Sequence, residues 1–412
     1  MTWDNRFACI TCAALLCTAA ARADVAPTSI APAPAAASVV AASPVVVAAP
    51  VPVATTVATP APTTPIVIVE TAPAPDTPPI AERGAFDMAR WESVLDTVRT
   101  RATAEKISKK TIDTTLKNPA FIPNIVKRDQ NQSEFKLTLD GYLNRTVNPT
   151  RIASGRKMAN KYPTLLKRVH ARYGVQPHVI LAFWGMESNY GARMADHPLR
   201  DAFVTLIYEG RRQTFFTNQL IALMKIADKN GDDISDYGGS WAGAMGHFQF
   251  IPTTLAAYGV DGNGDGKIDI SGSIGDAMMS AGNYLNRLGW NENERIVRRV
   301  VLPADFDVSL LDGKTKKTLS DWAALGATLP DGRALPVTDM MAGMVADTVA
   351  INDARMNAAI APTDPNAVDM DVAPMPAITA YLTYSNFYRI KKWNNSNWYA
   401  IAIAELADAL HQ

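Results

Sequence analysis

The spacing of apolar residues predicts a mainly helical chain from about Phe86 onwards. Trp91, Val94 and Val98 recur at helical spacing after Phe86, and "EFKLTLDGYL" and "YPTLLKRVHARYG" continue the pattern up to Gly174. Further along, "VRRVVLPADFDVSL" and "GRALPV" break the helical period with β-branched residues, prolines and turn glycines. The pattern therefore predicts a mainly α (α+β) fold with a small strand-bearing part.

The most apolar run of the chain carries a single acid. In "VILAFWGMESNYGARM" the acid is Glu187, and Pro177 before the run and Gly191 within it suit the first turn and the left-handed stop of a helix. In the last turn of that helix, the macrodipole and the apolar neighbours both raise the pKa of a carboxyl group. A carboxylic acid that stays protonated near neutral pH can act as a general acid in glycosidic cleavage. The alternative is a surface Glu that is solvated or paired to Arg193.

A glycine-rich stretch, "DYGGSWAGAMGHFQFIPTTLAAYG", follows between Asp236 and Gly259. Its glycines let the backbone approach a ligand closely, and Pro252 suits the start of a short helix that stops at Gly259. Ser240 and Gln249 alternate with aromatic residues, a mixture that suits the hydroxyl rim and the C–H faces of a sugar. A glycine-rich packing loop would have much the same composition.

The segment "DGNGDGKIDI" has part of the pattern of a calcium loop. Gly266 stands at the sharp turn, but the twelfth position is Gly272, where an EF-hand has Glu, so Asp276 is the best replacement for that ligand. A metal-free Asp/Gly turn is the alternative. The candidate calcium ligands are Asp261, Asn263, Asp265, Lys267 through its backbone carbonyl, and Asp276.

Charge and composition exclude several classes of function. The 412 residues have a formal net charge of +0, so the basic excess of a nucleic-acid-binding protein is missing. The five histidines are not at zinc spacing, and the chain has no phosphate-binding glycine loop. We therefore expect neither a metallopeptidase nor a nucleotide-binding protein.

The first 84 residues are expected to lie outside the folded part. Residues 1–23 resemble a signal peptide, with an apolar run and a small-x-small cleavage pattern at Ala21 to Ala23. Lipid anchoring is disfavoured because Leu15 and Leu16, which are not small, precede Cys17. Residues 24–84 are a Pro/Ala-rich linker, expected to be disordered and extended. An inert tether is the simplest role, and docking to cell-wall proteins is the alternative.

Four motifs together resemble one family. "WGMESNYG", "GSWAGAMGHFQFIPTT", "DGNGDGKIDI" and "GNYLNRLGW" occur in the order and approximate spacing of the B-type lytic murein transglycosylases, glycoside hydrolase family 103. The resemblance covers residues 85–412 and implies a lysozyme-like helical core. The expected parts are N-terminal helices over 85–175, the core with its calcium-type loop over 176–295, the strand-bearing part over 296–345, and C-terminal helices that close the groove over 346–412.

The resemblance also implies roles for individual residues. Glu187 matches the single catalytic acid of the family, while Trp393 stands where a tyrosine is common and "DQNQSEF" from Asp129 lacks the usual Arg and Pro. The matching substrate-binding residues are Ser240, Gln249, Tyr284, the basic pair Arg211 and Arg212, Asn394 and Tyr399.

A lytic transglycosylase is therefore the function that we expect. The family cleaves the MurNAc–GlcNAc β-1,4 bond of peptidoglycan by attack of the muramic C6 hydroxyl, without a cofactor, and gives 1,6-anhydromuropeptides in the periplasm. The expected partners are peptidoglycan glycan strands, with structural Ca²⁺ and no nucleic acid. Two alternatives stay open, a true muramidase that uses water and a second carboxylate, and a non-catalytic glycan-binding scaffold of the cell wall.

Overall fold

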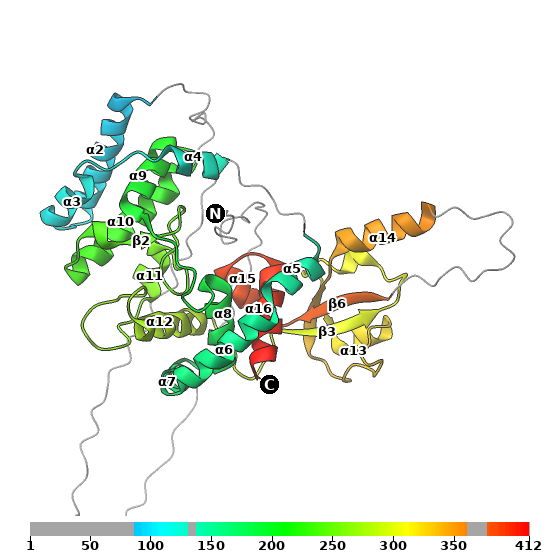
Figure 1. Cartoon of the computed structure of the whole chain (residues 1–412). Helices are drawn as coiled ribbons and strands as arrows, with labels where there is room; N and C mark the ends of the chain where they lie inside the picture. Colours follow the sequence, from blue (N-terminus) through cyan, green and yellow to red (C-terminus); the bar gives the residue numbers. More distant parts are fainter. Residues whose placement is uncertain (1–85, 131–136, 361–376, 412) are drawn as a thin grey trace, which may run out of the picture. The chain divides into compact units, whose positions relative to one another are not determined.

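The computed structural model describes residues 86–130, 137–360 and 377–411 (Figure 1). The predicted signal peptide and linker lie outside these residues. Within them, no helix combines the length and the apolar character that crossing a membrane requires. The segment up to Gly174 is mainly helical, as the apolar spacing predicts, and C-terminal helices follow the sheet, as the family resemblance implies.

The helices and strands follow one another as Figure 1 labels them. The helices are α2 (Met88–Ala104), α3 (Lys109–Leu116), α4 (Pro123–Gln130), α5 (Leu139–Thr146), α6 (Pro149–Lys161), α7 (Pro163–Tyr173), α8 (Pro177–Ser188), α9 (Leu199–Glu209), α10 (Gln213–Asn230), η2 (Ile234–Asp236), α11 (Pro252–Tyr258), α12 (Ile274–Arg287), η3 (Val308–Leu310), α13 (Leu319–Ala324), α14 (Thr348–Ile360), α15 (Ser385–Trp393) and α16 (Asn397–His411). The strands are β1 (His197–Pro198), β2 (Gly238–Gly239), β3 (Val297–Leu302), β4 (Lys317–Thr318), β5 (Met341–Val345) and β6 (Ile378–Thr383).

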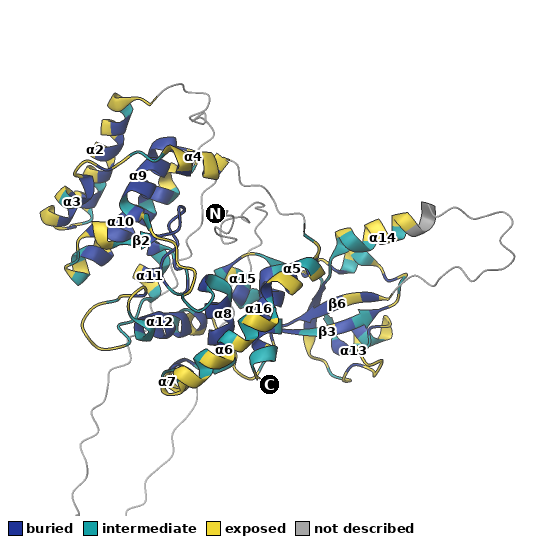
Figure 2. Ribbon diagram, in the orientation of Figure 1, coloured by how far each residue is buried: buried dark blue, intermediate teal, exposed yellow. Residues whose placement is uncertain are grey.

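Helix α8 is the central helix of the larger core. It is buried from Val179 to Gly185 and packs against α16, α6, α7 and α12 (Figure 2). Pro177 begins it as predicted, but it ends at Ser188, before the predicted stop at Gly191. The reason is Asn189, which already adopts the left-handed conformation (φ 50°), as Asn does more readily than most residues.

The N-terminal helices are fastened to α9 by an aromatic cluster and by buried polar contacts. The rings of Phe86, Trp91, Phe121 and Tyr208 lie within 5.0–5.9 Å of one another. Phe86 itself precedes α2, since the helix is capped at Asp87 and begins only at Met88.

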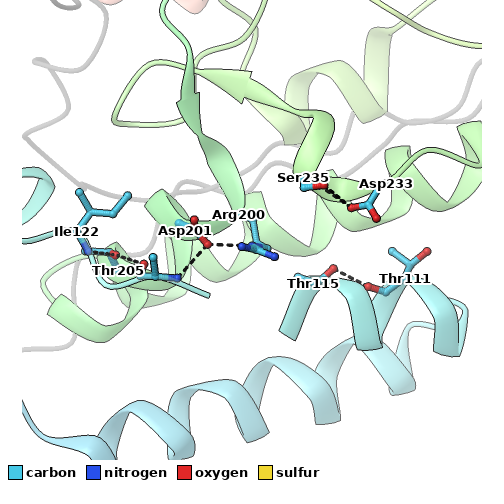
Figure 3. Close-up of polar contacts among 9 residues, drawn as sticks. Thr111, Thr115, Ile122, Arg200, Asp201, Thr205, Asp233 and Ser235 are labelled. Carbon is cyan, nitrogen blue, oxygen red and sulfur yellow. Dashed lines mark hydrogen bonds and ion pairs between the residues drawn. The ribbon is translucent and has the colours of Figure 1, made fainter. Parts of the chain in front are cut away.

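Hydrogen bonds complete this attachment (Figure 3). The N–H groups of Ala120 and Ile122 donate to Asp201 (3.1 Å) and Thr205 (3.0 Å) on α9. Arg200 Nε also donates to Asp201, at 2.9 Å. The segment between α3 and α4 is thereby held on α9 by its backbone as well as by its side chains.

A four-stranded antiparallel sheet forms the second core, in the order β3–β6–β5–β4. Strand β6 (Ile378–Thr383) pairs with both β3 and β5, although it lies beyond the range 296–345 in which strands are expected. Trp322 on α13 is fully buried in this second core, and its indole N–H donates to the carbonyl of Ala342 at 2.9 Å. The boundaries of the four expected parts stay predictions.

We predict that Trp322→Ala lowers the free energy of unfolding by about 3–5 kcal/mol, because it leaves a large cavity in a small core. Val337 lies in the same part of the chain but is 90% exposed, so Val337→Ala should change stability by less than about 0.5 kcal/mol. Urea unfolding measures both. Equal effects of the two substitutions would contradict the packing described here.

Candidate active site

Glu187 meets Tyr399 where α8 packs against α16. The tyrosine hydroxyl, which is almost completely buried, donates to Glu187 Oε1 at 2.5 Å. Glu187 itself is half-buried in the last turn of α8. The contact joins residues 212 positions apart in the chain, so the folded arrangement of α8 and α16 alone creates it.

The environment of Glu187 raises the pKa of its carboxyl group from 4.5 to about 7. Burial is the largest cause, and hydrogen bonds from Tyr399 and then Trp393 oppose it by stabilising the carboxylate. The raised pKa agrees in direction with the prediction from the apolar run. Near neutral pH this group is poised between the acid and the base, as general acid–base catalysis requires.

An aromatic cluster lies beside this acid. The ring of Trp393 lies 4.6 Å from that of Phe183, 5.1 Å from that of Tyr284 and 5.2 Å from that of Phe250. Tyr284 also stacks on Tyr258, with centroids 4.6 Å apart, and its hydroxyl donates to the carbonyl of Lys392 at 3.3 Å. Trp393 thus connects the cluster with the hydrogen bonding of Glu187.

Three further predicted residues are polar groups in restrained positions. Asn394 is 8% exposed, and its Nδ2 has no hydrogen-bond partner among the described residues. Gln249 has a left-handed backbone (φ 49°), and its Nε2 donates to the carbonyl of Gly246 at 2.8 Å. Ser240 is buried, and its hydroxyl accepts from the N–H of Ala244 at 2.9 Å. Of the three, only Asn394 has a buried side-chain atom without any hydrogen-bond partner among the described residues.

The predicted basic pair is already engaged within the protein. Arg211 Nε donates to the buried carboxylate of Asp129 at 2.9 Å, and Arg212 bonds the same carboxylate at 2.5 Å. The second oxygen of Glu209 accepts from the N–H of Arg211 at 2.7 Å. Asp129 begins the "DQNQSEF" segment, so this ion-pair cluster links the start of that segment to the turn before α10.

The calcium-type loop brings three carboxylates together. Asp261, Asp265 and Asp276 each offer an oxygen, and these atoms lie within 4.8 Å of one another. The backbone N–H of Lys267 is the main cause that lowers the pKa of Asp265, so this group is ionised as a ligand must be. Asn263 lies in the same loop, with its Nδ2 donating to Asp265 at 2.8 Å. The ammonium of Lys267 pairs with Asp232 at 2.5 Å.

Tyr142 on α5 is a site residue that the sequence analysis missed. Its hydroxyl is buried without a partner among the described residues, and burial raises its pKa to about 12, with the charge of Glu187 as the second cause. The segment that carries it shows only helical periodicity, so its place beside Glu187 depends on tertiary packing.

Two acidic residues that follow Glu187 in the sequence have partners of their own. Asp201 accepts from Arg200, and Glu209 accepts from the backbone of Arg211. Neither they nor Asp196 are among the groups that shift the pKa of Glu187. Among the described residues, Glu187 therefore has hydroxyl and indole donors as its partners and no paired carboxylate.

Comparison with known proteins places this site in a family context. Residues 90–408 match the family model of the transglycosylase SLT domain, which covers more than half of the chain. Membrane-bound lytic murein transglycosylase B of Escherichia coli (strain K12) is 28% identical over 276 residues. That match spans 65% of this chain and 66% of the relative, just under two thirds of its length.

Solved structures agree with the fold. Two structures of SltB3 from Pseudomonas aeruginosa, in complex with NAG-anhNAM-pentapeptide and NAG-NAM-pentapeptide, are each 36% identical, with a TM-score of 0.67 over 78% of this chain and 79% of theirs. Escherichia coli Slt35 in complex with calcium is 24% identical, with a TM-score of 0.61 over 78% of this chain and 92% of that one, and shows the fold alone. The expected mainly α, lysozyme-like fold with a small sheet is confirmed.

We predict that Glu187→Gln lowers turnover about 10²- to 10⁴-fold, because the amide cannot transfer a proton.

The same substitution should stabilise the protein at pH 8. In the unfolded chain the carboxyl loses its proton near 4.5, whereas in the folded chain it does so near 7. The folded state therefore binds the extra proton between these values, and stability falls as the pH rises through this window, by roughly 3 kcal/mol at most.

Glutamine has no such titration, so the variant should be more stable than the parent at pH 8 and close to it at pH 4. Urea unfolding at both pH values measures the difference, and Glu92→Gln on the exposed face of α2 is the control. A stability difference that does not depend on pH would show that burial does not raise the pKa of Glu187.

Proposed function

We propose that this chain, which belongs to the transglycosylase SLT domain family, is a B-type lytic murein transglycosylase. It would cleave the MurNAc–GlcNAc β-1,4 bond of peptidoglycan. The observation that carries the proposal is the lone carboxyl of Glu187, with a pKa of about 7 and a tyrosine hydroxyl as its partner. Hydrolysis by two carboxylates would need a second acid beside it. SltB3, which is similar to this chain, binds an anhydro-muramyl sugar, and this supports the same outcome.

In the proposed reaction Glu187 acts twice. As an acid it protonates the oxygen that leaves with GlcNAc, while the bond from that oxygen to muramic C1 breaks. The muramic C6 hydroxyl then attacks C1, after assistance from the N-acetyl carbonyl, and gives its proton to the carboxylate of Glu187. The hydroxyl of Tyr399 stabilises the carboxylate between the two steps. No water is consumed, and the product ends in a 1,6-anhydro ring.

The other site residues bind and orient the glycan. The buried, unpartnered Nδ2 of Asn394 suits a carbonyl acceptor such as an N-acetyl group. The faces of Trp393 and Tyr284 suit the C–H faces of sugar rings. Gln249 and Ser240 hold the glycine-rich turn in place by their own hydrogen bonds. Arg211 and Arg212 are paired with Asp129, so their role in this proposal is to order the turn before α10 and not to present free positive charge.

We further propose that the protein is exported to the periplasm, with residues 1–23 as its signal peptide and the linker as a tether. Calcium binding by Asp261, Asn263, Asp265, Asp276 and the carbonyl of Lys267 belongs to the same proposal. Carboxyl oxygens of three side chains within 4.8 Å of one another suit a hard cation that prefers oxygen ligands. Calcium bound to the related fold of Slt35 supports this assignment. The ion would order the loop and would take no part in the chemistry.

Digestion of purified peptidoglycan should yield muropeptides with 1,6-anhydro muramic ends. These ends have no aldehyde, so borohydride leaves their mass unchanged. A muramidase would instead give ends about 18 Da heavier, which gain about 2 Da on reduction, because water takes the place of the C6 hydroxyl. Mass spectra dominated by reducible ends would exclude the transglycosylase, and binding without fragments would favour the scaffold.

Calcium added to chelator-treated protein should raise its melting temperature, since a ligand that binds only the folded state stabilises it by about 2.7 kcal/mol at 100 times its Kd. Asp265→Ala should abolish the shift. Differential scanning calorimetry with and without calcium measures it, with magnesium as the ion control. An equal shift of the melting temperature in the parent and the variant would show that calcium does not bind through Asp265 in this loop.

A further inference from the structure

Two hydrogen bonds join His247 to the C-terminal end of α8, the helix that carries Glu187. The indole N–H of Trp184 donates to His247 Nδ1 at 3.1 Å, and the hydroxyl of Ser188 donates to the His247 carbonyl at 2.7 Å. Trp184 and Ser188 lie one turn apart on the same face of α8, and Ser188 directly follows Glu187. The side chain and the backbone of one residue thus hold one face of the helix end that carries Glu187.

The turn that His247 holds has an unfavourable backbone. Asn189, Tyr190 and Gly191 are three consecutive residues with positive φ (50°, 60° and 84°). Such conformations persist only where surrounding contacts enforce them. Here the hydroxyl of Ser188 accepts from the N–H of Gly191 at 2.9 Å, and a Cβ on Gly191 would lie 2.6 Å from the His247 ring. The ring therefore covers the turn directly after the catalytic residue.

On its other side, His247 is joined to the calcium-type loop. Its backbone N–H donates to the carbonyl of Ile270 at 3.0 Å. The preceding residue, Asp269, donates its N–H to Asp276 Oδ2 at 2.8 Å. Asp276 is fully buried and belongs to the carboxylate group of the loop. A short path of backbone and carboxylate hydrogen bonds thus runs from the loop to the end of α8.

We propose that His247 is a positioning residue that fastens the last turn of α8 to the calcium-type loop and so holds Glu187 in its catalytic orientation. The indole of Trp184 can only donate, so Nδ1 must be the unprotonated acceptor and the ring hydrogen lies on Nε2. The loop is thereby coupled to the acid through a defined contact. The expected effect on kcat rests on the proposed function, and the coupling to the loop rests on the proposed calcium binding.

His247→Phe and His247→Asn together test the role of the ring acceptor. Phenylalanine keeps a ring without an acceptor, whereas Asn Oδ1 replaces Nδ1 at the same number of bonds from the backbone. We expect kcat to fall about 10- to 100-fold in His247→Phe with KM changed less than twofold, because a small misplacement of a catalytic group is costly. His247→Asn should recover to within threefold of the parent. His170→Phe, at an exposed histidine on α7, is the matched control and should leave kcat unchanged.

A readout without substrate tests the connection to the loop. The indole ¹⁵N–H resonance of Trp184, assigned with Trp184→Phe, should shift on adding calcium to the chelator-treated parent and to His247→Asn. In His247→Phe it should already be displaced and should not respond, although calcium still raises the melting temperature. If His247→Phe does not fold, the calcium response of the Trp184 resonance in His247→Asn and in the parent tests the connection.

Three results would overturn the proposal. They are a folded His247→Phe with kcat within threefold of the parent, a His247→Asn that falls as far as His247→Phe, or a parent Trp184 resonance that ignores calcium while the melting temperature rises. A failure of the proposed function would look different. The parent would then release no anhydro ends, while the Trp184 resonance would still report the contact.

Discussion

The contact between Glu187 and Tyr399 is the interaction on which the rest of the site depends. A carboxyl group in apolar surroundings tends to stay neutral, and a neutral acid can give a proton but cannot take one back. The hydroxyl of Tyr399 offsets part of this effect by stabilising the carboxylate. Because the donor comes from α16 and the acid from α8, the chemistry requires that these two helices pack in one register.

The sequences of the two helices explain why they can do so. Helix α16 presents small residues among isoleucines in "AIAIAELA", and α8 is buried along most of its length, so their axes can approach closely. At the far end of the pair, the rings of His178 and His411 lie 4.5 Å apart. On another side of α8, a Cβ on Gly155 or Gly185 would collide with the hydroxyl of Tyr190. Close packing on both sides thus leaves α8 little freedom to slide.

The raised pKa of Glu187, the helices and the acidic turn could be predicted from the sequence because each is a local property. An apolar run with one Glu near its end, a proline at a helix start and Asp or Asn at alternate positions are patterns of neighbouring residues. The hydroxyl of Tyr142 beside Glu187, the pairing of Arg211 with Asp129 and the central place of β6 in the sheet all join distant segments. No periodicity encodes such contacts, so these features required the folded structure. The family resemblance indicated Tyr399 and Asn394, but not the hydrogen bond or the unpartnered amide.

Trp393 shows how the kind of hydrogen-bond donor can influence the balance between the protonated and ionised forms of Glu187. A tyrosine hydroxyl can donate to a carboxylate and can also accept from a protonated carboxyl, so it stabilises both forms. The indole N–H only donates, and its hydrogen bond to the charged carboxylate is stronger than one to the neutral carboxyl, so it favours the ionised form. With tryptophan where the family commonly has tyrosine, burial must raise the pKa against a partner that always favours the base. The apolar packing of Phe183 and Phe250 around that indole therefore matters twice, because it positions the donor and also contributes to the burial that raises the pKa.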